Sequence, residues 1–101
     1  MALELVYRPT AQGDLDAIYD WIADHAGPNI AFLYVGRIEA ARRALLDFPG
    51  RGTPHDELAP GLRSIAFERR ATIFYRLTGP KLEIVHILHA GRDPERAFEA
   101  D

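Results

Sequence analysis

Two apolar stripes with helical spacing are separated only by Gly27-Pro28, and this arrangement constrains the fold more than any other feature of the chain. The first stripe predicts an amphipathic helix over residues 10–26, and the second predicts a helix from Pro28 up to Pro49-Gly50. Glycine suits the end of one helix and proline the first turn of the next. We therefore expect an antiparallel helical hairpin. The stripes are Ala11, Leu15, Ile18, Tyr19 and Ile22, then Ile30, Tyr34, Ile38, Ala41, Leu45 and Phe48.

The other segments are typical of short strands and tight turns. Alternation at the start of the chain predicts a strand around Leu3, Leu5 and Tyr7, and Thr10 is the expected N-cap of the first helix. Residues 49–61 are rich in proline and glycine and predict a loop. Three further strands are predicted over residues 62–67, 71–77 and 82–89, joined as antiparallel hairpins. From Pro94 the chain either forms a last helical turn or frays. The order β-α-α-β-β-β predicts an α+β fold with the hairpin packed on one face of a small, mainly antiparallel sheet.

Composition limits the functional classes. A chain of 101 residues predicts a single domain over residues 1–101, and the lack of cysteine excludes disulfides and thiolate catalysis. Glu4 and Arg8 interrupt the first apolar stretch, so we expect no signal peptide, no membrane partner and a cytoplasmic protein. A net charge of −3 argues against a general DNA binder, so we expect no direct nucleic-acid binding. No motif for a phosphate, dinucleotide or zinc site occurs, and we expect neither cofactor nor metal.

Candidate chemistry gathers near the C-terminal strands. His86 and His89 are three residues apart, which places them on opposite faces of a strand and makes them a poor pair of metal ligands. The favoured interpretation of each is a structural imidazole that hydrogen-bonds inside the fold. The alternative is RNA cleavage, which requires a base, an acid and cations at the phosphate. The residues available for that chemistry are Arg63, Tyr75, Arg76, His86 and His89.

Two further groups have both a structural and a functional interpretation. Arg76 shares a strand face with Phe74 and must therefore find a carboxylate, carbonyl groups or water. The candidate partners are Asp56 or Glu57 of the long loop, or an acidic residue of another protein. A set of three apolar residues lies off the main helical stripes. They are either partly buried at the seam of the hairpin or form an apolar groove for a partner. These residues are Trp21, Phe32 and Val35.

A series of short motifs, in order, resembles the ParE-type toxins of the RelE/ParE superfamily. Each motif is weak alone, but their order and spacing are fairly specific, and they span nearly the whole chain. They are Ala11-x-x-Asp14-Leu15-x-x-Ile18-Tyr19, Gly27-Pro28, Leu45-x-x-Phe48-Pro49-x-x-Gly52, Asp56-Glu57-Leu58-x-Pro60-Gly61-Leu62-Arg63, Phe74-Tyr75-Arg76, and Glu83-Ile84-Val85-His86-Ile87-Leu88-His89-Ala90-Gly91-Arg92-Asp93.

The resemblance implies a toxin of a type II toxin–antitoxin system. It implies neutralisation by a ParD-like antitoxin with a ribbon-helix-helix half, and DNA gyrase as the target. RelE-type relatives instead cleave mRNA on the ribosome, but this chain departs from them because Lys81 is its only lysine. Many family members carry arginine where this chain has His86, so no role is transferred to that position. We expect a toxin without enzymatic activity, with a ribosome-dependent endoribonuclease as the alternative. The expected antitoxin or target contacts are Trp21, Phe32, Val35, Arg63, Arg76 and Arg92.

Overall fold

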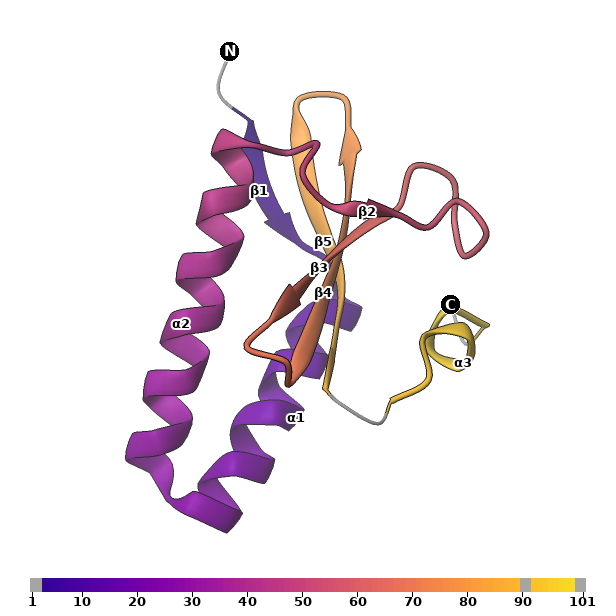
Figure 1. The fold of residues 1–101 in the computed structure, drawn as a ribbon. Coiled ribbons are helices and arrows are strands. Elements are labelled where there is room, and N and C mark those ends of the chain that lie inside the picture. The colour runs from indigo at the N-terminus through magenta and orange to yellow at the C-terminus, as the bar shows by residue number, and fades with distance from the viewer. Residues whose placement is uncertain (1–2, 90–91, 100–101) are drawn as a thin grey trace.

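The fold has a helical hairpin on one side of a twisted sheet and a short helix on the other (Figure 1). This computed structural model describes residues 3–89 and 92–99. Its elements are β1 (Glu4–Tyr7), α1 (Pro9–Ala26), α2 (Pro28–Asp47), β2 (Thr53–Pro54), β3 (Arg63–Phe67), β4 (Ala71–Thr78), β5 (Lys81–His89) and α3 (Pro94–Glu99). The predicted α+β class and the helical hairpin are confirmed.

Within the described residues the sheet has five strands in the order β1-β5-β4-β3-β2. β2, β3, β4 and β5 pair antiparallel, as predicted for the last three of them, whereas β1 lies parallel to β5. The two-residue strand β2 falls inside the segment that was predicted to be a loop. β1 and β5, the first and last strands along the chain, are therefore neighbours in the sheet, and the hairpin forms the crossover between β1 and the rest of the sheet.

The helix ends follow their local sequence with two exceptions. Gly27 has φ of 98° and donates its N–H to the carbonyl of Ala23 at 3.0 Å, so α1 ends at a glycine as expected. The predicted N-cap at Thr10 is wrong, because α1 begins at Pro9, which suits a first helical turn. Phe48 was expected on the buried stripe, but α2 ends one residue earlier and Phe48 is exposed.

The start of α2 also departs from the expected stripe. Ile30 is exposed, and the neighbouring Ala31 packs into the core in its place. The hairpin brings the first turn of α2 close to α1, and a small residue fits such an approach. The other residues of both stripes are buried in the larger core or, like Tyr19 and Ala41, pack partly buried against it.

Both faces of the sheet are covered, but unequally. The hairpin covers one face, here called the helix face, and buries the larger core against it. The opposite or outer face carries a smaller buried cluster, covered by the loop after β2 and by α3 (Figure 1). The helix-face strand residues are Phe67, Ala71, Ile73, Tyr75, Leu82, Ile84 and Ile87. The outer-face cluster is Leu62, Phe74, Val85 and Leu88, with Leu58, Ala59, Ala97 and Phe98 packed on it.

A bulge in β5 sets which side chains reach the outer face. Phe74 pairs with His86 and Tyr75 with Ile84, so Val85 is an extra residue at this step of the ladder. A bulge of this kind disturbs strict alternation locally. Val85 packs in the outer cluster and His86 also lies on that side, while strict alternation resumes beyond it.

Candidate functional site

α1 closes the edge of β5 beyond the last residue that β1 pairs with. Thr10 Oγ1 donates to the carbonyl of Val85 at 2.6 Å, and Asp14 Oδ2 accepts the N–H of Ile87 at 3.0 Å. The same Asp14 oxygen lies 2.7 Å from Nδ1 of His86. Side chains therefore satisfy backbone groups that another strand would otherwise satisfy. This set of contacts, the α1–β5 clamp, joins two segments more than 70 positions apart in the chain.

His86 is a structural residue of this clamp. Its side chain is buried, and its ring packs edge-on against Phe98 of α3, with 4.8 Å between ring centroids. Because a carboxylate only accepts hydrogen bonds, Nδ1 of His86 carries the proton that faces Asp14. His86 thus hydrogen-bonds inside the fold, as the interpretation as a structural imidazole requires.

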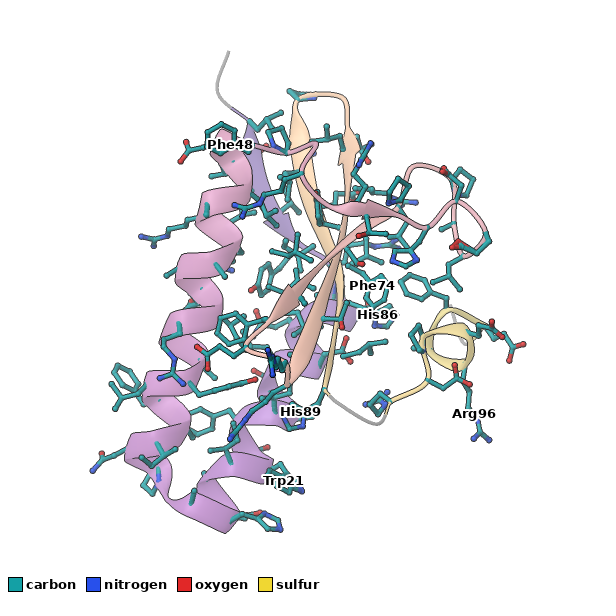
Figure 2. The ribbon with its side chains drawn as sticks, in the orientation of Figure 1. Trp21, Phe48, Phe74, His86, His89 and Arg96 are labelled. Atoms are coloured by element: carbon teal, nitrogen blue, oxygen red, sulfur yellow. The ribbon has the colours of Figure 1, made fainter. Side chains whose placement is uncertain are left out.

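His89 lies on the opposite face of β5, as strand geometry predicted. Its ring is 5.9 Å from the ring of Trp21 on α1 and 6.4 Å from that of Tyr34 on α2, centroid to centroid. Figure 2 labels both histidines and Trp21, and His89 lies on the side of the hairpin. The two histidines therefore do not converge on one reaction centre.

Arg63 and Tyr75 hold the segment that follows α2. Tyr75 donates its hydroxyl hydrogen to the carbonyl of Pro49 at 2.8 Å and accepts the N–H of Gly52 at 3.0 Å. Nη1 of Arg63 donates to the carbonyls of Gly50 at 3.1 Å and Gly52 at 2.7 Å. A Cβ at Gly52 would lie 2.6 Å from the Tyr75 hydroxyl oxygen, so only glycine fits this approach. Both side chains serve the fold.

Arg76 pairs with the acid directly opposite it on β5. Its Nε lies 3.1 Å from Oε1 of Glu83, which also accepts the hydroxyl of Thr78 at 2.7 Å. The Thr78 hydrogen bond and then the Arg76 hydrogen bond lower the pKa of Glu83. The predicted partners in the loop were wrong. Asp56 instead accepts the N–H of Gly61 at 2.9 Å, and Glu57 lies 3.3 Å from Nδ1 of His55.

The proposed nuclease residues are thus divided between the two faces of the sheet. Paired residues of antiparallel strands share a face, so Arg63 lies with its partner Tyr75 on the helix face. His89 is on that face too, while Arg76 and His86 lie on the outer face. Four of the five have an internal hydrogen-bond partner. The structure does not bring this set together.

A groove of about 240 Å³ opens between α1 and β5 beside the clamp. Trp21, 54 % exposed, forms one wall and stacks on His25 with ring centroids 4.0 Å apart. We call this the Trp21 groove; its lining is Asp14, Ala17, Ile18, Trp21, Ile87, His89 and Arg92. Phe32 and Val35, the other two candidate groove residues, do not line this groove. Phe32 is 71 % exposed on α2, and Val35 packs partly buried against the core at the seam.

A second hollow, of about 330 Å³, lies on the outer face next to the Trp21 groove. His89 and Arg92 border both. The β3–β4 turn adds Arg69 and Arg70, which the sequence interpretation had treated only as turn residues. We call this the arginine hollow; its lining is Ala66, Arg69, Arg70, Ala71, Thr72, Phe74, Leu88, His89, Arg92 and Pro94. The sequence feature that could have indicated this hollow is the pair of adjacent arginines, Arg69 and Arg70, in a three-residue turn.

The arginines discussed above differ in whether their side chains form hydrogen bonds or ion pairs within the fold. Arg63 and Arg76 were expected contact residues, but both are held inside the fold. In residues 3–89 and 92–99, no ion pair or side-chain hydrogen bond forms at Arg69, Arg70 or Arg92. Of the three arginines expected as contacts, Arg92 alone is exposed and forms no such bond to any residue that the structure describes.

The part of the chain that the structure describes offers neither a membrane span nor a metal centre. No helix among these residues is long and apolar enough to span a bilayer. Among them, no three histidine, aspartate or glutamate side chains gather in a geometry that could hold a metal ion.

Comparison with known proteins gives the family. Residues 5–94 match the family described as ParE toxin of type II toxin–antitoxin system, parDE. The chain belongs to the ParE toxin family. It is 31 % identical over 97 residues to Toxin ParE1 of Mycobacterium tuberculosis, an alignment that covers 95 % of this chain and 98 % of that protein. It is 33 % identical over 81 residues to Toxin ParE3 of Caulobacter vibrioides, covering 80 % and 79 %.

A solved structure supports the same family assignment. The chain superposes with a TM-score of 0.77 and 28 % identity on a chain from the chromosomal ParDE TA system of P. aeruginosa. The match covers 87 % of this chain and 96 % of that one. The α+β fold with a helical hairpin is therefore a ParE fold. This member of the ParE family is the toxin component of a type II toxin–antitoxin system.

Proposed function

We propose that this toxin inhibits DNA gyrase and catalyses no reaction of its own. The ParE resemblance supplies gyrase as the target. One observation supports the absence of enzymatic activity: the candidate nuclease residues are divided between the two faces of the sheet. Arg63, Tyr75 and Arg76 also each form a hydrogen bond within the fold. A net charge of −3 also removes the general attraction that a basic ribosomal nuclease has for RNA.

We further propose that a ParD-like antitoxin neutralises the toxin by placing an apolar side chain in the Trp21 groove. The structural relative comes from a ParDE system, which points to this kind of partner. Trp21 presents a large exposed aromatic surface next to the apolar wall formed by Ala17, Ile18 and Ile87. Amphipathic helices bind grooves of this type, and an antitoxin segment that folds on binding fits it.

Arg92 is the proposed charged contact to the target. It is exposed, has no ion-pair partner among the described residues and lies beyond the end of β5. Arginine side chains at such positions are well suited to bidentate recognition of acidic groups.

Two purified reactions test the target. The toxin is added to gyrase with relaxed plasmid, and in parallel to a cell-free translation reaction. We expect supercoiling to be inhibited while the message remains intact. Message cleaved within codons in the ribosomal A site, with supercoiling unaffected, would replace this proposal with the endoribonuclease. Induced expression without antitoxin adds a third arm, because normal growth would mean that toxicity has been lost.

A pair of aromatic variants tests the antitoxin surface. Trp21→Ala removes the groove wall, and Phe48→Ala removes an aromatic side chain that is also exposed but lies at the far end of α2. We expect Trp21→Ala to weaken antitoxin binding by about 2 kcal/mol or more, the size of an aromatic hot spot, with Phe48→Ala near wild type. Calorimetric titration of the antitoxin measures both. Equal affinities for the two variants would rule out the groove as the binding site.

A further inference from the structure

We propose that the arginine hollow binds a phosphate group, carried either by a nucleotide or by the backbone of DNA. This goes beyond the proposed function, because neither gyrase nor an antitoxin is needed for such binding. The first reason is charge. Three exposed arginines border the hollow, and none of its lining residues is acidic.

The acidic residues next to these arginines in sequence are directed elsewhere. Glu68 is drawn onto α2 by Arg37, with Nε to Oε2 at 2.7 Å and Nη2 to Oε1 at 3.2 Å. Asp93 accepts the N–H of Glu95 at 3.1 Å at the start of α3. Arg70 still acts electrostatically on Glu68, but neither Glu68 nor Asp93 lines the hollow. The charged side chains of the lining are therefore all positive in a chain whose net charge is −3, which is the electrostatic setting of an anion site.

The backbone of the β3–β4 turn supplies the second reason. Glu68 and Arg69 have φ of 48° and 60°, in the left-handed region. A turn with two such residues favours asparagine and glycine, because other side chains are strained there. Each side chain instead has a definite location: Glu68 is bound by Arg37, and Arg69 faces the hollow. The strain is consistent with a requirement for the arginine side chain at this position.

Size and shape supply the third reason. The volume of about 330 Å³ is near the lower limit for small-molecule sites. Small side chains at Ala66 and Thr72 leave room above the outer face of the sheet, and the Thr72 hydroxyl adds a polar group at the wall. Several guanidinium groups around one small space match the multiple acceptor oxygens of a phosphate better than a single carboxylate.

The test measures binding by the full-length chain to three probes. ATP is titrated by calorimetry, and a short labelled DNA duplex is followed by fluorescence anisotropy. A poly-glutamate peptide is the third probe, because an acidic protein segment is the rival ligand. The variants are Arg69→Ala and Arg70→Ala, with Arg43→Ala as the control, since Arg43 is exposed on α2 away from the hollow. Thermal melting checks that all three variants fold.

We expect ATP, the duplex or both to bind, with affinity at least about tenfold lower in each hollow variant and unchanged in the control. For the duplex, the slope of log affinity against log salt should fall by about 0.9 for each phosphate that a variant no longer neutralises. Binding of ATP alone identifies a free nucleotide as the source of the phosphate, and binding of the duplex alone identifies DNA.

Three results overturn the proposal. The first is no binding of either phosphate probe, and the second is binding only to poly-glutamate, which makes the hollow a site for an acidic protein. The third is a decrease in affinity for Arg43→Ala as large as the decreases for the two hollow variants. The loss of affinity would then follow from the change in net charge and not from the hollow. Because gyrase is absent from all of these binding experiments, their results do not test the proposed inhibition of gyrase, which the supercoiling reaction tests separately.

Discussion

The two faces of the sheet differ in how completely they are covered. The hairpin buries the helix face along nearly its whole length, whereas the outer face is covered by a loop and the single short helix α3 (Figure 1). The arginine hollow opens where this thinner cover ends, and the Trp21 groove opens beside it at the edge of β5. The comparison indicates that the helix face supplies most of the stability, while the partly covered end of the sheet remains available for binding.

The largest expected effect compares one core residue from each face. Ile73 is buried on the helix face and Leu88 in the outer cluster, where it also borders the hollow. We expect Ile73→Ala to lower the free energy of unfolding by about 3–5 kcal/mol and Leu88→Ala by about 2–3 kcal/mol, because a site near an opening collapses or hydrates more easily. Denaturant titration measures both. A larger decrease for Leu88→Ala would reverse the comparison.

The second prediction concerns the α1–β5 clamp, which lies beside the Trp21 groove. Asp14→Ala removes the acceptor for the Ile87 N–H and for Nδ1 of His86. We expect the free energy of unfolding to fall by about 2 kcal/mol, since buried donors are left without an acceptor. Hydrogen exchange should accelerate at Ile87 and stay slow at Ile73. Unchanged exchange at Ile87 would show that the clamp adds nothing to the closure of this edge.

The third prediction uses pH to examine the outer face. The Thr78 and Arg76 hydrogen bonds lower the pKa of Glu83, so its contribution to stability is present above the unfolded-state pKa and is lost as pH falls through the folded-state pKa. Arg76→Ala should cost about 1 kcal/mol at neutral pH, because the pair is partly exposed and Thr78 remains bonded to Glu83. Unfolding curves across the acid range should converge for wild type and variant. A constant difference at all pH values would contradict this account.

The smallest prediction is a gain in stability. Arg69→Gly relieves a left-handed backbone, and we expect the free energy of unfolding to rise by about 0.5–1 kcal/mol. The same change should weaken phosphate binding, as in Arg69→Ala. Arg70→Gly is the matched control, because φ at Arg70 is not positive and glycine there brings no relief. A decrease in stability for Arg69→Gly would show that the arginine stabilises the turn.

The sequence predicted the parts of the fold that local patterns determine. Helical periodicity around Gly27-Pro28 predicted the hairpin, and short turns predicted the three antiparallel strands. The parallel pairing of β1 with β5 was not predicted, because it joins the two ends of the chain and leaves no local pattern. Thr10 was misassigned for the same reason, since its hydroxyl bonds to a carbonyl 75 residues away.

The site was predicted only in part. Arg92 and Trp21 were expected contacts, and both border openings at the end of the sheet. Arg76 and Arg63 were expected contacts too, but their partners depend on which strands are neighbours, and those partners turned out to be internal. The arginine hollow required three-dimensional information, because it joins a turn at residues 69–70 to the segment after β5.

The most direct test of the account is inhibition of gyrase supercoiling by the purified toxin, compared among wild type, Arg92→Ala and Arg43→Ala. Both arginines are exposed, but only Arg92 lies at the end of the sheet where the two openings meet. The account predicts inhibition by wild type and Arg43→Ala, and inhibition at least about tenfold weaker for Arg92→Ala, the size of one charge-assisted hydrogen bond. Full supercoiling in the presence of the wild-type toxin, or equal inhibition by all three proteins, would contradict it.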